Sequence, residues 1–74
     1  MPVDQLEKRY LGILLDGLAE ARYPSAPMLD RIEASITDRQ TAEAYIGSLL
    51  DRLSEDRFPS PPMVDRVRAL LSML

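Results

Sequence analysis

The sequence predicts an all-α fold, and three observations carry that prediction. Apolar residues recur every three or four positions over long segments, which is the spacing that lines one side of an α-helix. Prolines and serines stand where such helices would end and begin. Finally, segment 10–34 recurs as 45–69, a repeat with a period of 35 in which 15 of the 25 aligned pairs are identical. We expect one domain, 1–74, built from repeat 1 (about 2–36) and repeat 2 (about 37–74).

The first helix is predicted to start around Asp4 and Glu7, because acidic residues and short acceptors suit a helix N-terminus. It must stop near Arg22, because a proline at position 24 pushes the residue before it out of the α region. The apolar residues predicted to share one side of this helix are Leu6, Tyr10, Ile13, Leu14, Leu18 and Ala21.

The second helix is predicted to follow a tight corner, with Ser25 as its N-cap and an end near Ile36. Its inward stripe comprises Met28, Leu29, Ile32 and Ile36. This helix is much shorter than the first.

The third helix repeats the first. The segment Thr37-Asp38-Arg39-Gln40 resembles a capping box, in which Thr37 and Gln40 satisfy exposed backbone N–H groups, so the helix should begin near Asp38 and end near Arg57. Its expected apolar track comprises Ala42, Tyr45, Ile46, Leu49, Leu50 and Leu53.

The fourth helix should begin after Ser60, with Pro61 and Pro62 tolerated in its first turn, and run to about Met73. Its inward stripe comprises Met63, Val64, Val67, Leu70, Leu71 and Leu74. The four helices therefore alternate long-short-long-short. We expect two tandem helical hairpins that pack face to face about a pseudo-two-fold axis as a four-helix bundle.

The composition argues against several classes of function. Nine Lys and Arg against twelve Asp and Glu give a net charge of −3, which opposes binding to nucleic-acid phosphates. The chain has no histidine or cysteine, so we expect no metal and no cofactor, and a cytoplasmic location fits the lack of disulfides. No apolar run approaches the roughly 20 residues of a membrane span.

Catalysis has little support in this sequence. Carboxylates at i and i+4, such as Asp16 with Glu20 and Asp51 with Glu55, share a helix face, but no histidine, cysteine or phosphate-binding loop accompanies them. We interpret them as solvated surface groups and expect no enzyme. Gly12 and Gly47, in mid-helix, suggest a close backbone approach at that level.

The most specific motif is the corner Arg-aromatic-Pro-Ser-x-Pro-Met, which occurs twice. One interpretation is architectural: the aromatic residue packs into the bundle end, the proline stops a helix and the serine caps the next. The other is a paired recognition surface anchored by the two aromatic residues. The residues of this candidate recognition surface are Arg22, Tyr23 and Pro24 in the first corner and Arg57, Phe58 and Pro59 in the second.

The two copies differ along one stripe of their long helices. Ile13, Gly17 and Ala21, spaced by four, align with Ser48, Arg52 and Asp56, so the stripe is apolar or small in one copy and polar in the other. Either the last helix folds over the first stripe, or a second molecule covers it.

From these features we expect a small, soluble protein–protein interaction module without catalytic activity, with the stripe on the first helix as its binding surface. The alternative is a structural homodimerisation or docking element. A small-ligand-binding bundle is the third hypothesis. The partner would be another protein or a second copy of the chain.

Overall fold

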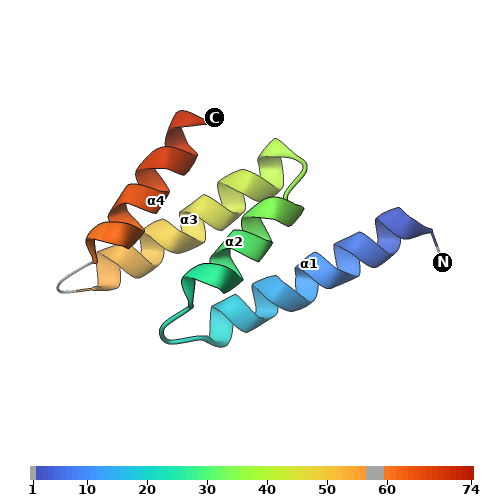
Figure 1. The fold of residues 1–74 in the computed structure, drawn as a ribbon, viewed down its shortest axis with the longest axis horizontal. Coiled ribbons are helices and arrows are strands. Elements are labelled where there is room, and N and C mark those ends of the chain that lie inside the picture. Colours follow the sequence, from blue (N-terminus) through green and yellow to red (C-terminus); the bar gives the residue numbers. More distant parts are fainter. Residues whose placement is uncertain (1, 57–59) are drawn as a thin grey trace. The chain divides into compact units, whose positions relative to one another are not determined.

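The computed structural model describes residues 2–56 and 60–74. In these residues the chain forms four α-helices and no strand: α1 (Val3–Glu20), α2 (Ala26–Ser35), α3 (Arg39–Glu55) and α4 (Pro61–Ser72) (Figure 1). Their lengths are 18, 10, 17 and 12 residues. The predicted all-α fold and the long-short-long-short order are confirmed.

The chain divides into two compact units, Met1–Ile36 and Thr37–Leu74. Each unit is one helical hairpin, α1 with α2 and α3 with α4. The division falls where the two sequence repeats meet. The face-to-face packing of the hairpins about a pseudo-two-fold axis, and the single domain, stay predictions.

The first hairpin is held together at its corner end. Leu18 of α1 is buried, as are Leu29 and Ile32 of α2. After α1 ends, the backbone N–H of Ala21 donates to the carbonyl oxygens of Gly17, at 3.0 Å, and Leu18, at 3.2 Å. The backbone is extended at Ala21, so α1 ends at Glu20. This end lies two residues before Arg22, where Pro24 predicted it.

The predicted serine caps are confirmed in both hairpins. The Met28 N–H donates to Ser25 Oγ at 3.3 Å, and the Met63 N–H donates to Ser60 Oγ at 3.4 Å. Pro61 and the following proline occupy the first two positions of α4, where a missing N–H costs nothing. Both short helices therefore begin by the same local chemistry.

The start of α1 differs from the prediction. Pro2 is the N-cap, without a side-chain hydrogen bond, and its carbonyl oxygen accepts from the N–H groups of Gln5, at 3.1 Å, and Leu6, at 3.2 Å. Asp4 lies in the first turn, where its charge favours the helix N-terminus.

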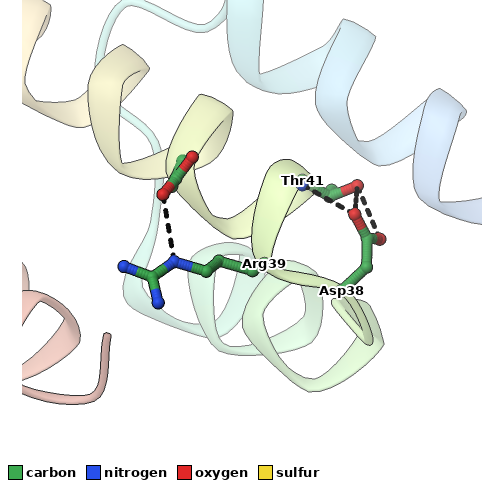
Figure 2. A network of polar contacts seen from close by, with 4 residues as sticks. Asp38, Arg39 and Thr41 are labelled. Carbon is green, nitrogen blue, oxygen red and sulfur yellow. Dashed lines mark hydrogen bonds and ion pairs between the residues drawn. The ribbon is translucent and has the colours of Figure 1, made fainter.

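The start of α3 also differs, because Asp38 and not Thr37 is the N-cap. The Thr41 N–H donates to Asp38 Oδ2 at 2.9 Å, and the Thr41 hydroxyl lies 2.7 Å from Oδ1 and 2.9 Å from Oδ2 (Figure 2). At the first residue of α3, Arg39 Nε donates to Oε1 of Glu43, one turn along the helix, at 3.1 Å. The Asp38 carboxylate accepts from both the N–H and the hydroxyl of Thr41, so the cap lies one residue after the predicted Thr37.

The buried side chains of the second hairpin are Tyr45, Ile46 and Leu49 of α3 and Val67 of α4. The predicted inward stripe of α4 is wider than the face that is buried. Its half-buried members are Met63 and Leu70, and its exposed members are Val64, Leu71 and Leu74. Val64 and Leu71 are seven residues apart and therefore share one edge of the helix, which lies outside the packed face.

The predicted close approach at the mid-helix glycines is wrong within the hairpins. A Cβ placed on Gly12 or Gly47 would meet no described atom of its own hairpin within 4 Å. The close contact occurs instead at Gly17, where a Cβ would lie 3.1 Å from Met28 Cε of α2. The absence of a side chain at position 17 lets the methionine of α2 lie against α1.

Candidate functional site

The N-terminal half of α1 extends beyond the helix that pairs with it. At 1.5 Å per residue, α1 with 18 residues is about 27 Å long and α2 with 10 residues about 15 Å. The two helices diverge from their corner, and the blue N-terminal half of α1 has no helix of its own hairpin beside it (Figure 1). All residues from Pro2 to Tyr10 are exposed.

This uncovered half carries a line of large apolar side chains. Val3 is 67 % exposed, Leu6 48 %, Tyr10 48 % and Ile13 66 %. Their spacing of three, four and three residues places them along one line of the helix, as in the seam between two packed helices. We call these four residues the α1 stripe. A contiguous line of exposed large apolar side chains is typical of a binding surface, whereas isolated ones are ordinary.

The second copy does not keep this line. By the 35-residue period, Val3 corresponds to Asp38, Leu6 to Thr41 and Ile13 to Ser48. Asp38 and Thr41 are occupied in the N-cap of α3. The tyrosine is kept in both copies, but Tyr45 is only 2 % exposed where its counterpart in α1 is half exposed. The apolar stripe therefore belongs to the first hairpin alone.

The stripe predicted from sequence, Ile13, Gly17 and Ala21, coincides with the α1 stripe at one residue. Ile13 is exposed, whereas Gly17 is half-buried against Met28. Ala21 is half-buried too and is the C-cap of α1, beyond its last helical residue. The structure thus brings Ile13 together with residues nearer the N-terminus.

Sequence reasoning missed Val3, and it placed Leu6 and Tyr10 on the apolar side of the helix without including them in the candidate binding stripe. The signal that would have found them is the difference in helix length, which the sequence already predicted. A short helix can cover only the near half of a long antiparallel neighbour.

Two opposite charges lie along one edge of the α1 stripe. Arg9 and Asp16 are seven residues apart, so they share an edge of the helix, and Glu20 follows one turn after Asp16. All three side chains are exposed. Within the described part of the chain, Arg9 and Asp16 form no ion pair. The edge is thus basic toward the N-terminus and acidic toward the C-terminus.

The first corner presents its aromatic ring to solvent. Tyr23 is 83 % exposed, and Cζ of Arg22 lies 5.7 Å from the centre of its ring, a cation–π distance. The predicted packing of this aromatic residue into the end of the fold is therefore wrong, while Pro24 is half-buried. The second-corner residues Arg57, Phe58 and Pro59 lie outside the described residues, so the paired recognition surface stays a prediction.

Other kinds of site find no support in the described residues. They contain no group of three or more acidic side chains placed to hold a metal ion. None of their helices is both long and apolar enough to cross a membrane. The carboxylates considered for acid–base chemistry, Asp16, Glu20, Asp51 and Glu55, are all exposed.

Comparisons of this chain with models of known protein families, with curated proteins and with solved structures give no match. The function is therefore inferred from the chain's own surface.

Proposed function

We propose that this protein is a small protein–protein interaction module without catalytic activity, and that it binds its partner through the α1 stripe. The observation that carries the proposal is the uncovered apolar line on α1, of which three positions are polar in the second copy. Four large apolar side chains lie in water along one line of the helix. Moving them out of water is favourable, so a partner surface that covers them would gain binding free energy.

A partner helix suits this surface best. An exposed line with three-and-four spacing packs against the ridge of another helix, in the same way as amphipathic helices dock on hydrophobic faces. A structural homodimerisation element is the second candidate function, because a second copy of the chain also offers an exposed apolar helix face. A cytoplasmic location stays the expectation from composition.

The test copies the second repeat into the first. The double substitution Leu6→Thr with Ile13→Ser removes two members of the α1 stripe and keeps residues of moderate helix propensity. We expect loss of partner binding, measured by quantitative affinity capture, while the free energy of unfolding in urea changes by about 1 kcal/mol or less.

The matched control is Val64→Thr with Leu71→Ser, which removes two apolar side chains of similar exposure from the edge of α4. This control should retain every protein that the unaltered chain binds. If the α1 variant still binds those proteins in equal amounts, or if the α4 control loses them equally, the α1 stripe is not the binding surface.

A further inference from the structure

We draw no further inference here: the strongest candidate, the exposed apolar line of Val3, Leu6, Tyr10 and Ile13 on the N-terminal half of α1, already carries the proposed function, and nothing in the structure shows what covers it.

Discussion

The first hairpin and the second have the same plan but present different surfaces. Their short helices start with the same serine cap, and their long helices stop at matching positions, at Glu20 and Glu55. Along one face of the long helix, however, Val3, Leu6 and Ile13 of the first copy become polar residues in the second. The duplication has kept the residues that end helices and turn the chain and has changed those of one outer face.

A second difference concerns the short helices. Leu29 of α2 is 1 % exposed, whereas its repeat counterpart Val64 of α4 is 43 % exposed. Position in the repeat therefore does not determine burial, even between residues of similar shape.

The largest effect is expected at this pair. Leu29→Ala should lower the free energy of unfolding by about 2–5 kcal/mol, because it leaves a cavity among buried side chains. Val64→Ala should lower it by about 0.5 kcal/mol or less, because the side chain is already partly in water. Urea denaturation of both variants measures the difference. Equal losses would show that the two short helices are equally buried in solution.

The next effect tests the feature that the hairpins share. Ser25→Ala and Ser60→Ala should each cost about 1 kcal/mol, since each removes the acceptor of one N–H at a helix start. Asp38→Ala should cost a similar amount at the start of α3. Thermal and urea unfolding give the values. A clear inequality between the two serines would mean that the corners are not equivalent.

A smaller effect, of opposite sign, is expected at the glycines. Gly12→Ala and Gly47→Ala should each stabilise the protein by about 0.5–1 kcal/mol, because alanine favours the helix and no described atom of the same hairpin stands in its way. Gly17→Ala should gain less, because Met28 Cε must move to admit the methyl group. If alanine at 12 or 47 instead destabilises the chain, a neighbour approaches that glycine in solution.

The smallest effect concerns exposed ion pairs. Arg39 and Glu43 interact at 3.1 Å on α3, and their repeat counterparts Asp4 and Lys8 form no ion pair among the described residues. A double-mutant cycle with alanine should give a coupling of about 0.2–0.5 kcal/mol for the α3 pair, which high salt removes. The cycle for Asp4 and Lys8 should give a coupling near zero.

Local signals predicted the helices well. Pro24 and the capping serines affect the backbone only a few residues away in the chain. The order, relative lengths and most boundaries of the helices could therefore be predicted from sequence. The cap of α3 was displaced by one residue because Thr37 and Asp38 are adjacent acceptors. Both residue types cap helices, and the sequence did not show that Thr41 would donate two hydrogen bonds to Asp38.

The candidate site was predicted less well, for a different reason. Periodicity shows which residues share a helix face, and it grouped Leu6, Tyr10 and Ile13 correctly. It does not show how far a neighbouring helix extends along that face, so Ile13 was recognised as part of a contact surface while Leu6 and Tyr10 were not. Likewise, the small size of Gly17 was interpreted as an open contact surface, whereas a side chain of its own hairpin fills the space.

In an assembly formed through the α1 stripe, the polar residues that α3 carries at three of the four corresponding positions would limit the number of molecules. A chain with an adhesive face on each hairpin would link one molecule to the next and grow into a chain of molecules without a fixed end. A chain with one such face, used symmetrically, is saturated after two molecules have met. Asp38, Thr41 and Ser48 would thus prevent the addition of further molecules, a role separate from that of Asp38 and Thr41 at the start of α3.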